Sequence, residues 1–378
     1  MEPVARGEPG AHELLALARR DPKAAERALE ALPVAAQVAV VCEAPLADRG
    51  RILGLVPSPE ALIPELPAAE LCFTIKAIGL ADAAWVLEYA TPEQTVAAVD
   101  LDAWRGNNLE VATANEWLQA LARTSSEARL RNLESLDFEL LTLALRARIG
   151  IEQKPDDAQG WSPPESSQTL EGQFHYWALA DDDDLADVTE HLRTLFEGAY
   201  WSYFRLMHAI QWELPSDSEE WALRWRTGRL EDLGFPTWDD GMRVYRFLGP
   251  AARRELPAEP PKPPESWTLP VWLPQLPETG GPGDRIFRAI AEQDEAQRNA
   301  SFFAIVALAN RVAVADRLPL GDAESTPKAI EKAARFASAG LAYLAAEHGL
   351  SDAELVRRVG LEQLFRVGAN LDPEAARP

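Results

Sequence analysis

The sequence predicts a mostly α-helical protein, in which stacked helical hairpins that resemble an α-solenoid precede a helical domain with at most a small β-strand or hairpin. Three observations predict this fold class. Two stretches near the amino terminus match each other at a shift of 34 residues, and apolar residues recur at steps of three and four along much of the chain. Alternation of the kind that a strand needs is clearest in a single short segment.

The repeat relates the segments that begin at Leu32 and Leu66. In addition, Ser-Pro-Glu at Ser58 corresponds to Thr-Pro-Glu at Thr91 with a slip of one residue. Repeats of this length are usually helical pairs that bury their apolar faces only against neighbouring repeats. We therefore expect a helical-repeat domain over residues 1–150. The matched positions are Leu32/Leu66, Pro33/Pro67, Ala35/Ala69, Leu46/Leu80, Ala47/Ala81, Asp48/Asp82 and Leu53/Leu87.

Local signals mark individual helix ends within this domain. Thr91, Pro92 and Gln94 have the order of a capping box, with proline at the first helical position, where its missing N–H costs nothing. Gly79 is expected to end the helix that precedes it.

A second domain, aromatic-rich and helical with a short β element, is expected over residues 168–249. The composition of residues 154–167 shifts to Pro, Asp, Ser and Gln, which indicates a loop and a domain boundary. Phe174 and Tyr176 then alternate with His175 and Trp177, which predicts a β-strand.

Two helices are expected to follow this strand. Apolar residues from Leu185 to Ile210 recur at steps of three and four, which predicts one long helix that Pro215 terminates. Ser216 with Glu219 suggests a capping box for the next helix, and Gly234 is expected to end it.

The remaining chain is predicted to be a connector and a helical region. Prolines crowd residues 250–283, but interleaved Trp, Leu and Val residues indicate that this connector lies against the protein. Over residues 284–371 we expect a helix from Asp284 to about Arg317, one from Thr326 to Gly349, and a last helix from Ser351 to about Phe365.

The composition describes an acidic, folded chain. Its 37 Lys and Arg against 60 Asp and Glu give a formal net charge of −23, which repels phosphate backbones, so we expect no binding to nucleic acid. No basic segment followed by an apolar one opens the chain, and Asn310 and Arg311 interrupt the most apolar stretch. Cys42 and Cys72 lie in apolar helical runs, which favours buried, reduced thiols. We therefore expect a cytoplasmic protein without membrane insertion.

The sequence offers no constellation of catalytic or metal-binding residues. The acidic run from Asp181 to Asp184 lacks the glycine and the distal glutamate of a calcium loop, and it suits the positive end of the helix that follows. The glycine-rich segment at Thr279 follows a proline-rich connector and lacks the Lys-Ser/Thr of a phosphate-binding loop. We therefore expect no metal and no cofactor. The histidines are too scattered for a zinc site: His12, His175, His191, His208 and His348.

Nine of the twelve tryptophans lie between Trp161 and Trp272. Aromatic density beside acidic residues is also typical of carbohydrate sites, so a glycosidase-like hydrolase that uses carboxylates near this region is the alternative function. The helical spacing of Trp221 and Trp225, and the place of Trp201 near an apolar stripe, favour core packing instead.

Three arginines form the densest positive cluster of the acidic chain and are the candidate binding residues. A carboxylate or phosphate of a partner suits such a cluster. Spacing within one helix also favours local pairs with Glu220 and Asp232. The three are Arg224, Arg226 and Arg229.

The repeat, the helix starts at Ser58 and Thr91, and the segments Leu66–Gln94 and Trp225–Pro236 together resemble an uncharacterised bacterial family of helical proteins. Residues 20–105 resemble the amino-terminal domain of MgtE magnesium transporters in the spacing of leucines, prolines and acids. This resemblance implies a helical-repeat fold. The transporter's tandem nucleotide-like domain and membrane helices have no counterpart here, so no magnesium site is implied.

Together these observations lead us to expect a non-catalytic scaffold or adaptor that binds another protein. An enzyme is the less favoured possibility, and the hydrolase described above is its most plausible form. The sequence identifies neither the partner nor the oligomeric state.

Overall fold

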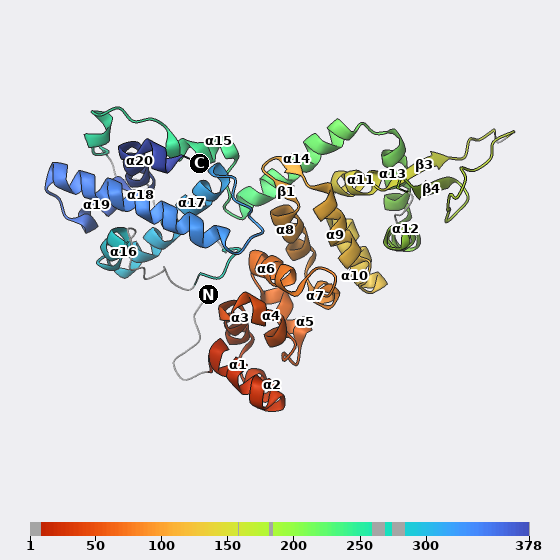
Figure 1. Cartoon of the computed structure of the whole chain (residues 1–378), viewed down its shortest axis with the longest axis horizontal. Helices are drawn as coiled ribbons and strands as arrows, with labels where there is room; N and C mark the ends of the chain where they lie inside the picture. Colours follow the sequence, from red (N-terminus) through yellow and green to blue (C-terminus); the bar gives the residue numbers. More distant parts are fainter. Residues whose placement is uncertain (1–8, 158, 181–183, 259–268, 274–283, 378) are drawn as a thin grey trace. The chain divides into compact units, whose positions relative to one another are not determined.

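The computed structural model describes residues 9–157, 159–180, 184–258, 269–273 and 284–377. These residues confirm a mostly α-helical fold with two small two-stranded sheets (Figure 1). The chain divides into two compact units, Met1–Gly228 (unit 1) and Arg229–Pro378 (unit 2), and the division falls within helix α14 (Pro215–Asp232).

Unit 1 is built from short helices, one 3-10 turn and four strands. The helices are α1 (Ala11–Arg20), α2 (Pro22–Glu30), α3 (Val34–Glu43), α4 (Leu46–Leu53), α5 (Pro59–Leu62), α6 (Ala68–Ile78), α7 (Ala84–Tyr89), α8 (Pro92–Asp102), α9 (Val111–Leu121), α10 (Ser126–Ser135), α11 (Phe138–Arg146), α12 (Ala186–Gly198), α13 (Tyr200–Trp212) and most of α14. The other elements are η1 (Ile63–Glu65), β1 (Trp104–Arg105), β2 (Asn108–Leu109), β3 (Ile149–Gln153) and β4 (Phe174–Ala178).

Helices in unit 1 pack on the helices two places along the chain. One row runs through α1, α3, α5, α7, α9, α11 and α13, and the other through α4, α6, α8, α10 and α12. The two matched stretches of sequence hold α3 with α4 and α6 with most of α7, while α5 and α8 begin at the corresponding Pro59 and Pro92. Because short helices cannot bury an apolar face alone, this stacking supplies their core.

Buried polar side chains tie successive helices of one row together. Arg49 of α4 donates to Glu70 of α6 at 2.6 Å, and both side chains are buried. Lys76 of α6 bonds Asp102 of α8 at 2.6 Å, and the indole of Trp117 donates to the same carboxylate at 3.0 Å. Such bridges fix the register of helices whose apolar faces alone would permit sliding.

Several predicted helix ends are confirmed. Thr91 accepts from the Gln94 N–H while the Gln94 side chain accepts from the Thr91 N–H, so α8 starts with a capping box. Gly79 has a φ of +97° at the end of α6. Gly234 follows α14 with a φ of +84°, and the Phe235 N–H bonds the Leu230 carbonyl at 2.8 Å, as in a Schellman motif.

The predicted strand is β4, and its partner is β3. The antiparallel register pairs Ile149 with Ala178 and Gln153 with Phe174. This ladder joins residues on the two sides of the boundary predicted at 154–167, so the helices before and after that loop belong to one unit. Trp177 lies against Gly150, where an added Cβ would come within 2.5 Å of the indole.

The prediction of a single long helix from Leu185 to Ile210 is wrong, because this segment forms two helices, α12 and α13. Ala199 adopts φ −146° and ψ 63° between α12 and α13, which breaks the helical path. Gly198 permits this corner to sit close to Leu130, since an added Cβ would lie 2.4 Å from a Leu130 methyl carbon. Both helices direct their apolar residues toward the core of unit 1. The three- and four-residue spacing of apolar residues therefore continues across the break.

The expected role of Pro215 is also wrong, because this residue begins α14 instead of ending the helix before it. Proline suits the first helical turn, where its missing N–H would have no partner. Ser216 therefore lies inside the helix and does not cap it.

Unit 2 is helical in the residues described. It contains the end of α14 and then α15 (Trp238–Met242), η2 (Arg243–Tyr245), η3 (Ala252–Arg254), α16 (Asp284–Ala291), α17 (Glu295–Ala315), α18 (Ser325–His348), α19 (Asp352–Val359), α20 (Leu361–Leu371) and α21 (Pro373–Ala376). Its apolar core gathers side chains from α16, α17, α18, α19 and α20. The apolar stretch from Ala300 lies in α17, and none of the described helices is both long and apolar enough to cross a bilayer.

In unit 2, α18 and α20 touch at two glycines, Gly340 and Gly368. A Cβ on Gly340 would lie 2.0 Å from the Leu364 carbonyl oxygen, and one on Gly368 would lie 1.9 Å from the Phe336 carbonyl oxygen. The two backbones are therefore in contact, and only glycine fits at this crossing.

Two of the three carboxyl-terminal helices expected are each divided in two. Asp294 accepts from the Gln297 N–H and starts α17 after a gap that follows α16. Gly360, with a φ of +80°, separates α19 from α20. The predicted cap at Ser351 and the predicted end at Gly349 are confirmed.

Part of the proline-rich connector lies among the described residues. Val271 and Trp272 are buried, and Leu269 and Leu273 pack against the core of unit 2. This confirms, for residues 269–273, the expectation that the connector buries side chains. The glycine-rich segment at Thr279 lies outside the described residues, as do Asp181, Asp182 and Asp183 of the acidic run.

Candidate functional site

The three candidate arginines lie on α14 but do not form one site. Arg226 is buried, and its guanidinium donates to the Asp100 carbonyl at 2.9 Å and to the Gly106 carbonyl at 3.3 Å. It also lies over the Trp104 ring, 5.0 Å from the ring centroid. Arg226 therefore anchors α14 to the end of α8 and to the β1–β2 turn.

Arg224 and Arg229 have other surroundings. Arg224 is exposed and lies over the Trp221 ring at 5.0 Å, and no ion pair with Glu220 is present among the described residues. Arg229 is half-buried. Because a helix turns about 100° per residue, Arg224 and Arg226 point to different sides of α14. The three arginines therefore do not share one exposed face.

Aromatic side chains instead form a line along the exposed side of α13. Trp201, Phe204, His208 and Trp212 are spaced by three or four residues and so share one face of the helix. The rings of Trp201 and Phe204 are 6.1 Å apart, and those of His208 and Trp212 are 6.4 Å apart. We call these four residues the aromatic stripe.

Three members of the aromatic stripe, Trp201, His208 and Trp212, are exposed, whereas Phe204 is half-buried against Phe174. Trp201 is 76% exposed and Trp212 is 61% exposed. The opposite face of α13 carries the buried residues Tyr203, Leu206 and Ile210. Sequence reasoning missed the stripe, although the same three- and four-residue spacing that predicted the helix also separates these two faces.

A second exposed aromatic group lies on α14. Trp221 and Trp225 are 44% and 49% exposed and stack with ring centroids 5.7 Å apart. Leu214, between the two helices, is also exposed. The expectation that Trp201, Trp221 and Trp225 pack in the core is therefore wrong. The buried face of α14 is made by smaller side chains and by Arg226.

Carboxylates near the other aromatic residues of this region accept hydrogen bonds from the fold itself. The Trp161 indole donates to Glu152 at 2.6 Å. Glu171 accepts from the Tyr203 hydroxyl at 2.7 Å and from the Phe174 N–H at 2.9 Å. These contacts position strands and helices, and the hydrolase alternative remains a prediction.

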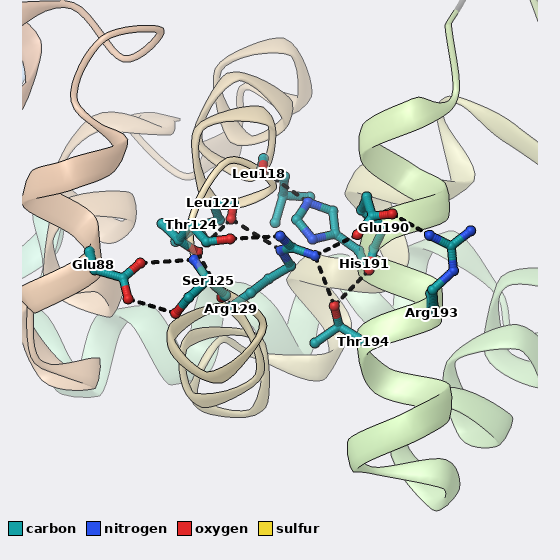
Figure 2. A network of polar contacts seen from close by, with 10 residues as sticks. All are labelled: Glu88, Leu118, Leu121, Thr124, Ser125, Arg129, Glu190, His191, Arg193 and Thr194. Atoms are coloured by element: carbon teal, nitrogen blue, oxygen red, sulfur yellow. Dashed lines mark hydrogen bonds and ion pairs between the residues drawn. The ribbon is translucent and has the colours of Figure 1, made fainter.

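A partly buried polar network in unit 1 joins four helices around the buried Arg129 (Figure 2). The guanidinium donates to the Thr124 carbonyl at 2.7 Å, to Glu190 at 2.9 Å and to Thr194 at 3.0 Å. Next to it, Glu88 accepts from the N–H and the hydroxyl of Ser125, the N-cap of α10. Acceptors from the protein surround Arg129, so this network holds α7, α9, α10 and α12 together.

His191 lies beside this network and is buried (Figure 2). Its Nε2 is 2.9 Å from the Leu118 carbonyl oxygen, so Nε2 carries the proton and donates. Nδ1 is buried without a hydrogen-bond partner among the described residues. Burial lowers the pKa of His191 to about 4, so the imidazole is neutral near pH 7 and inaccessible to a substrate.

The described residues contain neither a reactive thiol nor a metal-binding cluster of side chains. Cys42 and Cys72 are free and buried, and burial raises the pKa of both thiols. The described residues also contain no group of three or more His, Cys, Asp or Glu side chains placed to hold a metal ion.

Comparison with known proteins identifies a family without assigning an activity. A model of a family of unknown function, DUF6178, matches residues 26–376. No curated protein and no solved structure matched the chain. The resemblance of residues 20–105 to the MgtE amino-terminal domain therefore stays a prediction, whereas the match to the family model covers nearly the whole sequence. The chain belongs to the DUF6178 family of unknown function.

Proposed function

We propose that this protein is a non-catalytic scaffold or adaptor that binds another protein through the aromatic surface of α13 and α14. The observation that carries the proposal is the exposure of the aromatic stripe together with Leu214 and the stacked Trp221 and Trp225. Four tryptophans of this surface are exposed: Trp201, Trp212, Trp221 and Trp225. Their exposure gives up part of the favourable free energy that burial of such large apolar side chains usually contributes to folding. Tryptophan is also among the residues most enriched where protein interfaces carry their binding energy.

The geometry of the stripe suits a folded partner or a partner helix. Trp201 and Trp212 are eleven residues apart on α13, which is about 16 Å along a helix. Residues on the inner face of α13 are fixed by the core, so the stripe is presented on a rigid element. The net charge of −23 disfavours nucleic acid as the partner. We propose the cytoplasm as the place of action, since the two cysteines are free.

The stacked helices of unit 1 form the scaffold in this proposal. Pairing of each helix with the one two places along resembles the way helical-repeat proteins present extended surfaces. The resemblance of residues 20–105 to the MgtE amino-terminal domain supports the same idea of a helical-repeat platform.

A double substitution tests the proposal. Tagged full-length protein and its Trp201→Ser/Trp212→Ser variant are compared by affinity purification from native cells with quantitative mass spectrometry. We expect at least a tenfold loss of a protein that the unsubstituted chain retains. Both side chains are exposed, so folding should change little.

Phe247→Ser is the matched control, because Phe247 of unit 2 is as exposed as Trp201, at 76%. This variant should retain the same protein as the unsubstituted chain. Equal retention by all three proteins, or equal loss in both variants, would show that the stripe is not the binding surface.

A further inference from the structure

Unit 2 contains an open pocket of about 680 Å³ between α17 and the corner where α19 meets α20. Its apolar floor is formed by Ala300, Ala304 and Ala307, which share one face of α17 and are half-buried. Val356 and Leu361 line the facing wall. The short alanine side chains leave the space open, and the volume lies within the range of small-molecule sites.

Three arginines from three helices border this pocket: Arg311, Arg357 and Arg366. Arg357 is exposed and makes no hydrogen bond or ion pair with any described residue. Arg366 uses its Nε to donate to the Arg246 carbonyl at 3.2 Å, which leaves its two terminal nitrogens for another acceptor. Arg311 lies 3.8 Å from Glu362, the one acidic residue of the lining.

The backbone adds hydrogen-bond donors at the same place. Helix α20 begins at this corner, and Gly360 precedes it with a φ of +80° and no side chain to cap the first N–H groups. These N–H groups can donate hydrogen bonds to an anion next to the arginines. The dipole of α20 is opposed by that of α19, which ends at this corner, so the arginines supply the positive charge. Three guanidinium groups against one carboxylate make this pocket locally positive in a chain whose net charge is −23.

We propose that this pocket binds a small amphiphilic anion. The apolar body of the ligand lies on the alanine floor of α17, and its carboxylate or phosphate accepts hydrogen bonds from Arg357 and Arg366. Planar guanidinium groups suit both kinds of head group. This site lies within unit 2 and is independent of the aromatic surface of unit 1.

Titration calorimetry of the full-length protein with three probes that share one tail tests the proposal. The probes are dodecanoate, dodecyl phosphate and dodecyltrimethylammonium, each below its micelle concentration. We expect at least one anion to bind tenfold or more tightly than the cation. An acidic protein without this site would favour the cation. Tighter binding of dodecanoate would identify a free carboxylic acid as the ligand class, and tighter binding of dodecyl phosphate a phosphate ester.

Substitutions locate the binding. Arg357→Gln/Arg366→Gln should weaken binding of the preferred anion at least tenfold. Arg358→Gln, a change at an exposed neighbour that does not line the pocket, should leave the affinity unchanged. Glu362→Gln removes the one carboxylate and should tighten anion binding severalfold. Ala304→Phe fills the floor and should abolish binding, with circular dichroism to confirm that each variant is folded.

The proposal is overturned if no anion binds up to 1 mM, if the cation binds as tightly, or if Arg358→Gln weakens binding as much as the double substitution. Arg357 and Arg358 are both exposed, so their substitution tests charge and position on the surface. Arg366→Gln also removes the hydrogen bond to the Arg246 carbonyl, so Arg357→Gln alone is measured beside the double substitution and should weaken binding of the preferred anion as well.

Discussion

At the scale of single residues, burial separates side chains that look alike in the sequence. Arg224 and Arg226 are two residues apart, yet one lies over an exposed tryptophan and the other donates to two backbone carbonyls. Ser218, Ala222 and Arg226 are the buried residues of that stretch of α14, and they recur every four residues. The four-residue spacing is visible in the sequence, but an arginine at one of its positions is expected to be solvent-exposed. Only the structure shows the backbone carbonyls that accept hydrogen bonds from Arg226.

His191 makes the stability of the protein depend on pH. An imidazole in the unfolded chain takes up a proton below about pH 6.5, whereas His191 in the folded protein does so only near pH 4. The unfolded state therefore binds more protons between these values, and stability falls as the pH falls through this range. The titration of His191 should make the free energy of unfolding about 2 kcal/mol lower at pH 5 than at pH 7.

Urea unfolding at pH 7 and pH 5 measures this dependence. His191→Leu should be less stable at pH 7, because it loses the bond to Leu118, but the drop between the two pH values should shrink by about 2 kcal/mol. His208→Gln, a change at an exposed histidine, should keep the drop of the unsubstituted protein. If His191→Leu keeps it as well, His191 does not titrate as described.

At the scale of elements, the α18–α20 crossing depends on two glycines. Gly340→Ala or Gly368→Ala would place a methyl group about 2 Å from a backbone carbonyl oxygen, so the helices must separate. We expect each change to lower the unfolding free energy of unit 2 by about 3 kcal/mol. Gly228→Ala in α14 is the control, since its Cβ would meet nothing within 4 Å.

Thermal and urea denaturation followed by circular dichroism compare these variants. Gly228→Ala should be neutral or more stable by up to about 1 kcal/mol, because alanine favours the helix. A Gly340→Ala variant as stable as Gly228→Ala would mean that the two helices do not approach so closely in solution.

Element boundaries also show where apolar spacing loses information. The stretches 185–210, 284–317 and 351–365 each keep a helical pattern across a break. The break at Ala199 lies where the chain packs against Leu130 and so depends on a distant segment. The N-cap at Asp294 and the glycine at Gly360 are local features that the apolar spacing alone does not reveal. The capping box at Thr91 was predicted correctly because its bonds join residues only three apart.

At the scale of the whole molecule, the two units should open independently. Arg226→Met removes hydrogen bonds within unit 1, so amide exchange should accelerate in α8 and in residues 104–109 while α18 and α20 stay protected. Gly340→Ala should accelerate amide exchange in α18 and α20 while α8 and residues 104–109 stay protected. Hydrogen exchange with mass spectrometry resolves these segments, and parallel acceleration of both units in either variant would show a single cooperative unit.

Exposed aromatic residues could not be located from composition. The sequence identifies the tryptophan-rich region, but helical spacing favours core packing for Trp201, Trp221 and Trp225, which are exposed, because the sequence does not show which face of a helix has neighbours. The anion pocket escaped notice for a related reason. Its arginines are 46 and 9 residues apart along the chain, at positions 311, 357 and 366, and only the packing of α17 beside the α19–α20 corner brings them together.

The sequence by itself determined that this is a mostly helical, acidic chain with a capped α8, a strand at residues 174–178 and two buried thiols, because those features depend on neighbours within a few residues or on composition. Tertiary structure decided where long helical patterns break, which arginine is buried, which tryptophans face water and where positive charge gathers. Each of these depends on contacts between segments far apart in the chain, and local spacing does not encode which distant surface a helix face will meet.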